Sequence, residues 1–198
     1  MREVRVYFEG GGDSRDSKEA LRKGFRQLFQ KAGFSVGVIA CGRRGKALKD
    51  WKIALSSHPE AFNILLVDAE SAVVEGSTPW RHLSASDPSW QAPSVPEEHC
   101  HLMVQVMEAW FVADPEALAA YYGQGFAAGS LPARRNVEEI AKADIERSLK
   151  TATQKTRKGE YHKIRHASDL LARIDPAKVR ERARHCERLL ATLAKLSS

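Results

Sequence analysis

The sequence lacks several features that would place it in a special class. No stretch approaches the roughly 20 apolar residues that a membrane-spanning helix needs, and the basic N-terminus lacks the apolar segment of a signal peptide. Cysteine is scarce: Cys41, Cys100 and Cys186 are widely spaced and form no C-x-x-C pair. Such a set indicates neither a disulfide framework nor a structural zinc site. We therefore expect a cytoplasmic protein with reduced thiols and no membrane partner.

The first third alternates strand-like and helix-like segments. Residues 4–8 and 35–41 are rich in β-branched residues, whereas residues 17–32 carry apolar side chains at helical spacing and residues 42–57 also suit a helix. Residues 62–70 (FNILLVDAE) are apolar enough for a strand buried on both faces. With 198 residues and 43% hydrophobic content, the chain predicts one core. The β-α-β-α-β order predicts an α/β fold with a parallel sheet of about four strands.

The second third is less regular. Residues 71–98 are rich in Pro, Ser and Trp without periodicity, so we expect a lid, a binding loop or a disordered segment there. Residues 99–107 indicate a fourth strand, and the helical segment after it breaks at Asp114-Pro115. We expect an α/β domain over residues 1–125 and a helical extension over residues 126–198, packed together as one compact unit.

Positive charge is concentrated in the C-terminal part. From Arg134 onward the sequence has 17 Lys/Arg and 9 Asp/Glu, a balance of +8, whereas the preceding residues have 14 and 16, a balance of −2. The segment is helical in pattern, and Asp175-Pro176 indicates the start of a last helix that runs to about Leu196. This stripe suits a phosphate backbone or an acidic partner, and a solvated helical face is the simpler alternative.

Carboxylates follow three of the predicted strands. Glu9 closes the first, Asp68 and Glu70 close the third, and Glu108 follows the fourth. Ligands of open parallel sheets collect at the carboxyl ends of strands, and oxygen donors of this kind suit Mg²⁺. Residues 68 and 70 share one side if the strand geometry continues. Ordinary strand-end carboxylates are the alternative.

Glycines after Glu9 let the backbone turn sharply or approach an anion. They match neither G-x-x-x-x-G-K-[ST] nor G-x-G-x-x-G, so the known nucleotide-cradling motifs are excluded. His99 and His101 share a face of the fourth strand, but no assured further zinc ligands accompany them. Trp80 and Trp90, in the irregular segment, are candidates for stacking on bases or for docking a partner.

Two of these motifs together resemble the Toprim domain of topoisomerases, bacterial primases and overcoming-lysogenization-defect-type nucleases. Its pattern, a strand followed by E-G-x-x-D and then a strand followed by D-x-[DE], corresponds to VYFEGGGD and LLVDAE. Over nearly its whole length, the chain resembles the Toprim-like bacterial domain-of-unknown-function family 4276. That resemblance rests on VYFEGGGDS, CGRRGKALKDW, LLVDAE, PWRHL, HLMVQVMEAWFVADPEAL, NVEEI and YHKIRHASDLLARIDPAKV.

The resemblance implies specific roles for the acids. Glu9 would be a metal ligand or general acid/base, and Asp68 and Glu70 would hold Mg²⁺ or Mn²⁺. Asp13 matches the second acid of E-G-x-x-D, and Glu108 would complete a second metal site. Topoisomerases commonly have Asp at the position of Glu70, which leaves the number of metal ions open.

Basic residues complete this hypothesis. Arg43, Arg44 and Lys46 follow the second strand and are expected either to grip phosphate or only to begin a helix. Lys163 is expected to approach the carboxylates and stabilise developing charge, and His166 is an alternative general base. The predicted phosphate contacts in the C-terminal stripe are Arg157, Lys158, Lys163, Arg165 and His166.

Together with these acids and basic residues, the resemblance implies a Mg²⁺-dependent nuclease that acts on DNA or RNA. The resemblance adds a setting in bacterial anti-phage defence with an ATPase partner of the AAA or ABC type, and it is compatible with oligomers. One alternative is a non-catalytic Toprim-like module that holds nucleic acid or an ATPase subunit. Another is hydrolysis or transfer of phosphate on a small nucleotide.

Overall fold

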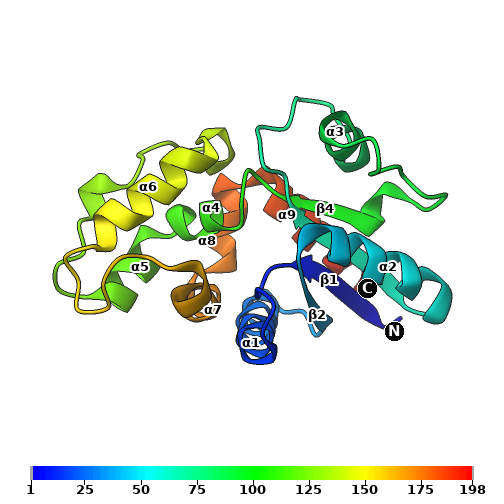
Figure 1. Ribbon diagram of the computed structural model, residues 1–198, viewed down its shortest axis with the longest axis horizontal. Coiled ribbons are helices and arrows are strands. Elements are labelled where there is room, and N and C mark those ends of the chain that lie inside the picture. Colours follow the sequence, from blue (N-terminus) through cyan, green and yellow to red (C-terminus); the bar gives the residue numbers. More distant parts are fainter. Residues whose placement is uncertain (1, 198) are drawn as a thin grey trace.

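The computed structural model describes residues 2–197 and contains a four-stranded, entirely parallel sheet (Figure 1). The strands lie in the order β2-β1-β3-β4. Their bounds are β1 Val4–Glu9, β2 Gly37–Gly42, β3 Phe62–Asp68 and β4 Cys100–Met103. The predicted α/β fold with about four parallel strands is confirmed.

Helices cover both faces of this sheet. One face packs against α1 (Arg15–Lys31) and α9 (Arg184–Ser197), and the other packs against α2 (Arg44–Ser57) and α3 (Pro79–Ser86). All seven residues of β3 are buried, as expected for a central parallel strand covered on both sides.

The remaining helices form a group beside the sheet, to the left in Figure 1. Their bounds are α4 Glu108–Ala113, α5 Pro115–Tyr122, α6 Lys142–Thr153, α7 Lys163–Arg173 and α8 Pro176–Arg182. Short 3₁₀ turns lie at Glu97–His99, Ala128–Ser130 and Val137–Glu139. Because α7 packs along α1, these helices share one hydrophobic core with a face of the sheet.

Caps explain several helix boundaries. The side chain of Asp114 accepts from the backbone N–H of Ala117, which ends α4 and begins α5 at the predicted break. Asp175 caps α8 in the same way, with Pro176 in the first turn. The expected single last helix is instead two, since α8 ends at Arg182 and α9 begins at Arg184.

Two other expectations need correction. The segment 71–98 is not entirely irregular, because Thr78 caps the N-terminus of α3 and Pro79 occupies its first turn. The fourth strand ends at Met103, so residues 104–107 lie outside the ladder. Among residues 2–197, no helix is long and apolar enough to cross a membrane.

Glycines join the ends of β1 and β2. Gly10 and Gly42 form an antiparallel bridge, in which each backbone N–H donates to the other residue's carbonyl, at 2.8 and 3.1 Å. Both have positive φ, +125° and +85°, and a Cβ on Gly42 would lie 2.8 Å from the carbonyl oxygen of Gly12. Only glycine fits this close approach without displacing the backbone.

Candidate metal centre

The chain changes direction across the sheet between β1 and β3. From β1 it runs to β2 on one side, and from β3 it runs to β4 on the other. Such a switch point leaves a crevice at the carboxyl ends of the two central strands, where ligands of open α/β sheets bind. Glu9 is the last residue of β1 and Asp68 the last of β3, so both acids stand at this crevice.

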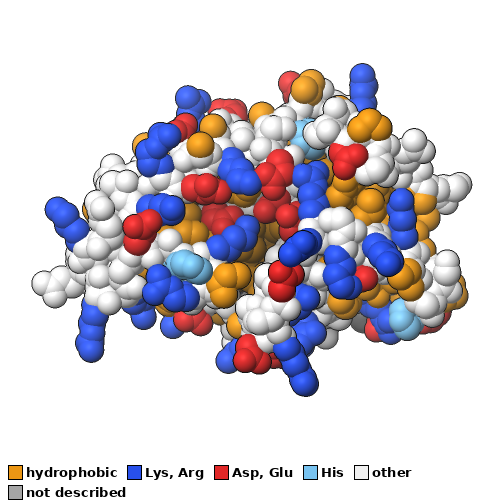
Figure 2. Space-filling view, viewed as in Figure 1, with side chains coloured by type: hydrophobic (Ala, Val, Ile, Leu, Met, Phe, Trp, Pro, Cys, Tyr) orange, Lys and Arg blue, Asp and Glu red, His pale blue; other side chains and the backbone are white. Residues whose placement is uncertain are grey.

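Three carboxylates converge there. Glu9, Asp68 and Glu70 each place one oxygen within 4.8 Å of the other two. Glu9 is half-buried, Asp68 is buried at 3% exposure, and Glu70 is exposed. On the face in Figure 2, acidic side chains gather at the centre with Lys and Arg side chains around them.

Backbone N–H groups orient two of these acids. The N–H of Asp68 donates to Glu9 Oε2 at 3.2 Å, and the N–H of Met107 donates to Asp68 Oδ1 at 2.8 Å. Each carboxylate therefore has one oxygen held by the main chain, and the second oxygen of Asp68 faces Lys163. The chain after β4 thus contributes to the site through its backbone.

Glu70 reaches the cluster by a different route from the one expected. The strand ends at Asp68, and Glu70 has φ +67°, which is unusual for a residue with a side chain. Its N–H donates to the carbonyl of Gln105 at 2.8 Å, which fixes this turn. The D-x-E spacing brings both acids together, but through a left-handed turn rather than a continued strand.

Two lysines neutralise the acids. Lys163 Nζ lies 3.5 Å from Asp68 Oδ2 and 3.4 Å from Glu108 Oε2, so α7 brings a positive charge to the carboxylates. Lys142 Nζ lies 2.5 Å from Glu70 Oε2. Sequence reasoning missed Lys142, which is 72 residues from its partner and has no motif around it.

Burial perturbs the titration of the centre. It raises the pKa of Asp68 to about 7, with the charge of Lys163 acting against this and those of Glu9 and Glu108 adding to it. Burial also raises the pKa of Glu9, against a hydrogen bond from the Asp68 backbone and the charges of Arg44 and Lys163. Burial by itself lowers the pKa of Lys163, but the negative charges of Asp68 and Glu108 outweigh this effect, so the pKa is raised. A cation at this position would relieve the cost of ionising the two buried acids.

Glu108 and Asp13 lie outside the three-carboxylate cluster. Glu108 is buried at the start of α4, where its Oε1 accepts from the Tyr161 hydroxyl at 2.9 Å and its Oε2 faces Lys163. Asp13 is largely exposed and pairs with exposed Arg43 at 3.2 Å. The structure therefore links Glu108 to the centre through Lys163 and leaves Asp13 on the surface.

Arg44 is the best placed of the three cations after β2. Its guanidinium stacks over the Trp90 ring, 4.8 Å from the centroid, and its buried Nε has no hydrogen-bond partner among residues 2–197. By contrast, Lys46 pairs with Asp50, and Arg43 pairs with Asp13. Arg44 alone of the three combines a fixed position near Glu9 with unused hydrogen-bonding capacity.

Only some residues of the predicted C-terminal basic stripe are exposed at the surface. Arg157, Lys158 and Arg165 are exposed, and Lys158 Nζ lies 4.6 Å from the centroid of the Tyr121 ring. His166 is buried at 5% exposure, and burial lowers its pKa. Its Nδ1 lies 3.1 Å from the Tyr122 hydroxyl, which makes it a packing histidine inside the helical group.

The loop tryptophans and the two histidines also have structural partners, and His99 lies in the 3₁₀ turn before β4 rather than in the strand as predicted. Trp80 and Trp90 are 5% and 4% exposed, so neither presents its ring for base stacking. His99 Nδ1 and His101 Nε2 bond backbone carbonyls, and burial lowers the pKa of His101 to about 3. In the described chain, the candidate metal-holding group is carboxylate alone.

These features define an α/β protein with an acidic centre at the switch point of a parallel sheet. The chain belongs to the family described as domain of unknown function (DUF4276), whose profile matches residues 8–194. Searches for similar curated proteins and for similar solved structures found no match.

Proposed function

We propose that this protein is a Mg²⁺- or Mn²⁺-dependent nuclease of the Toprim type, which hydrolyses phosphodiester bonds in DNA or RNA. The observation that carries the proposal is the meeting of Glu9, Asp68 and Glu70 at the carboxyl ends of the two central strands. The resemblance of VYFEGGGD and LLVDAE to Toprim motifs supports the same assignment. It also supports our proposal that the nuclease is the effector of a bacterial anti-phage system with an ATPase partner.

The donor set fits a hard divalent cation. Oxygens on opposite sides of one Mg²⁺ lie about 4.2 Å apart, since each Mg–O bond is about 2.1 Å. At most one pair among three ligands can be opposite, and adjacent oxygens lie about 3 Å apart, so carboxylate oxygens within 4.8 Å of one another would need side-chain shifts of up to about 2 Å. Glu9, Asp68 and Glu70 would then hold the ion.

When bound, the ion would supply electrostatic stabilisation to the reacting phosphate and lower the pKa of a water molecule. Lys163 is placed to stabilise negative charge that develops on the phosphate, since its Nζ already faces Asp68 and Glu108. Arg44, held over Trp90, offers its guanidinium to a neighbouring phosphate. Glu108, bonded to Tyr161, keeps Lys163 at the centre.

Glu9→Gln tests the proposal, because it removes a charged ligand while keeping the length of the side chain. We expect Mn²⁺-dependent cleavage of single- and double-stranded DNA and RNA to fall by at least about a hundredfold, as for loss of a catalytic electrostatic contact. Asp13→Asn is the matched control and should retain activity, because Asp13 is exposed and outside the cluster. Cleavage that survives in Glu9→Gln would refute the assignment.

A non-catalytic binding module is the second candidate. It is favoured by the two lysines, which neutralise Asp68, Glu70 and Glu108 without any metal. Calorimetry with Mn²⁺ separates the two candidates. If the protein is the nuclease, Mn²⁺ binds to the wild type and this binding is lost in Glu9→Gln. If it is the binding module, it binds nucleic acid but takes up no Mn²⁺.

A further inference from the structure

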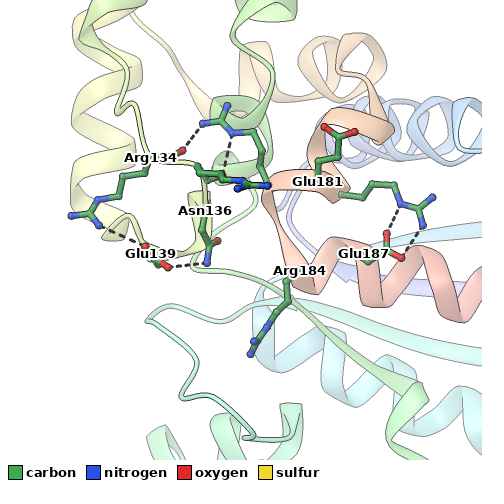
Figure 3. Close-up of a pocket in the computed structure, with 9 residues that line it drawn as sticks. Arg134, Asn136, Glu139, Glu181, Arg184 and Glu187 are labelled. Carbon is green, nitrogen blue, oxygen red and sulfur yellow. Dashed lines mark hydrogen bonds and ion pairs between the residues drawn. The ribbon is translucent and has the colours of Figure 1, made fainter.

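A cavity of about 580 Å³ lies between residues 134–139 and the junction of α8 and α9 (Figure 3). Its lining includes five arginines and three glutamates, a balance of +2, and none of the acids of the metal centre. We call it the arginine cavity. The five arginines are Arg134, Arg135, Arg180, Arg182 and Arg184.

Arg182 makes one wall of the cavity rigid. Its guanidinium donates to four backbone carbonyls, those of Val112 and Ala113 at 3.1 and 3.0 Å and those of Arg134 and Arg135 at 2.6 and 3.3 Å. These bonds tie the 134–135 segment to the end of α4. No carboxylate pairs with Arg182 among residues 2–197, so its charge adds to the positive potential of the cavity.

Two other arginines are already paired. Arg180 contacts Glu187 through both Nε and Nη2, and Arg134 lies 3.6 Å from Glu139, as Figure 3 shows for the latter pair. The Arg180 pair has two contacts, whereas the Arg134 pair is a single contact between exposed side chains. These pairs leave Arg135, Arg182 and Arg184 without a carboxylate partner among the residues that line the cavity.

Arg135 and Arg184 are the cations that a ligand can engage. Within the described chain, no acceptor for the Arg135 side chain is present, and that side chain is exposed. Arg184 lies 3.6 Å from Glu75, whose side chain is 92% exposed, and such a surface contact contributes little. Both guanidinium groups therefore retain their forked donors for an incoming oxyanion.

We propose that the arginine cavity binds phosphate groups of an anionic ligand. Guanidinium forks match the geometry of phosphate oxygens, and the volume lies in the range of sites for molecules the size of a nucleotide. A second cavity of about 290 Å³ shares Asn136, Glu139 and Arg184 with the first and extends to Ala72 and Val73, just beyond Glu70. Two kinds of ligand present such phosphate groups: a nucleic-acid strand that is bound at the metal centre, and a free phosphate compound.

The test is a binding measurement on the full-length protein in EDTA, so it is separate from cleavage and from the proposed function. Inorganic pyrophosphate is titrated by calorimetry, and a labelled single-stranded oligonucleotide by fluorescence anisotropy. The variant Arg135→Ala/Arg184→Ala is compared with Lys23→Ala/Arg26→Ala, which removes two exposed positive charges from α1. Each double variant removes two positive charges from exposed positions.

We expect the Arg135/Arg184 variant to lose at least about tenfold in affinity, since each charge-assisted hydrogen bond is worth about one order of magnitude. The α1 variant should stay within about twofold of the wild type. A loss confined to pyrophosphate identifies a free phosphate ligand, and a loss with the oligonucleotide identifies the nucleic-acid backbone. The proposal is overturned if neither probe responds to the Arg135/Arg184 change, or if the α1 variant loses as much.

Discussion

Replacing Asp68 with Asn should reverse the usual effect of mutating a buried charged residue. Asn keeps the oxygen that accepts from the Met107 backbone and removes only the ionisable group. In the unfolded chain the Asp68 carboxyl titrates near 3.8, whereas burial raises its pKa to about 7 in the folded protein. The folded state therefore holds this proton more tightly than the unfolded state does.

The sign of the pH dependence follows from this difference. Between the two pKa values the folded protein binds more protons than the unfolded chain, so stability falls as pH rises through the window from about 4 to 7. Between pH 5 and pH 8, Asp68 alone should lower the free energy of unfolding by roughly 2.5 kcal/mol. Asp68→Asn should lose this contribution and so be the more stable protein at pH 8 without metal.

Urea unfolding at several pH values in EDTA measures this contribution. Asp13→Asn is the control and should follow the wild-type curve, because its carboxylate is exposed. Saturating Mg²⁺ should then stabilise the wild type at pH 8 by about 2.7 kcal/mol at a hundred times the dissociation constant, and Asp68→Asn far less. Parallel pH curves for the wild type and Asp68→Asn, or equal stabilisation by Mg²⁺, would refute the reasoning.

Three further substitutions test the surroundings of the centre. Arg44→Met should weaken oligonucleotide binding about tenfold by anisotropy in EDTA, because it removes a charged phosphate contact, whereas Arg43→Met should change it little; equal losses would contradict the assignment. Tyr161→Phe removes the hydroxyl that donates to the buried carboxylate of Glu108, and it should destabilise the fold by about 1–3 kcal/mol in urea unfolding. An unchanged unfolding midpoint would count against that hydrogen bond. Gly42→Ala should lower the free energy of unfolding by at least about 1 kcal/mol because Gly42 has a positive φ, whereas Gly45→Ala should not, because open space surrounds Gly45. Equal thermal unfolding of the two variants would show that the close approach at Gly42 is absent.

The strands and the nearby acids could be predicted from local sequence because their signals are local. FNILLVD is apolar except for Asn63 and Asp68, as suits a strand buried on both faces, and its last residue carries the carboxylate to the edge of the sheet. The break at Asp114-Pro115 was also predictable, since a side-chain cap and a proline act within one turn. Parallel topology then brings Glu9 and Asp68 to the same edge.

The rest of the centre depends on contacts between distant segments. Lys142 reaches Glu70 only because α6 begins beside the chain that follows β4, where Gln105 accepts from the Lys142 backbone. Tyr161 and Glu108 are 53 residues apart and meet inside the helical group. No local pattern encodes such pairs, because they are set by how the helices pack on one another.

The Gly10–Gly42 bridge makes two parts of the centre dependent on each other. Glu9 directly precedes one glycine of the bridge, and Arg44 follows the other by two residues, so two backbone hydrogen bonds set the spacing between a proposed metal ligand and a proposed phosphate contact. Lengthening or shortening one loop would move both side chains at once. Changes in the two loops should therefore be tolerated only as matched pairs, and an engineer who wishes to retune the site would have to redesign both loops together.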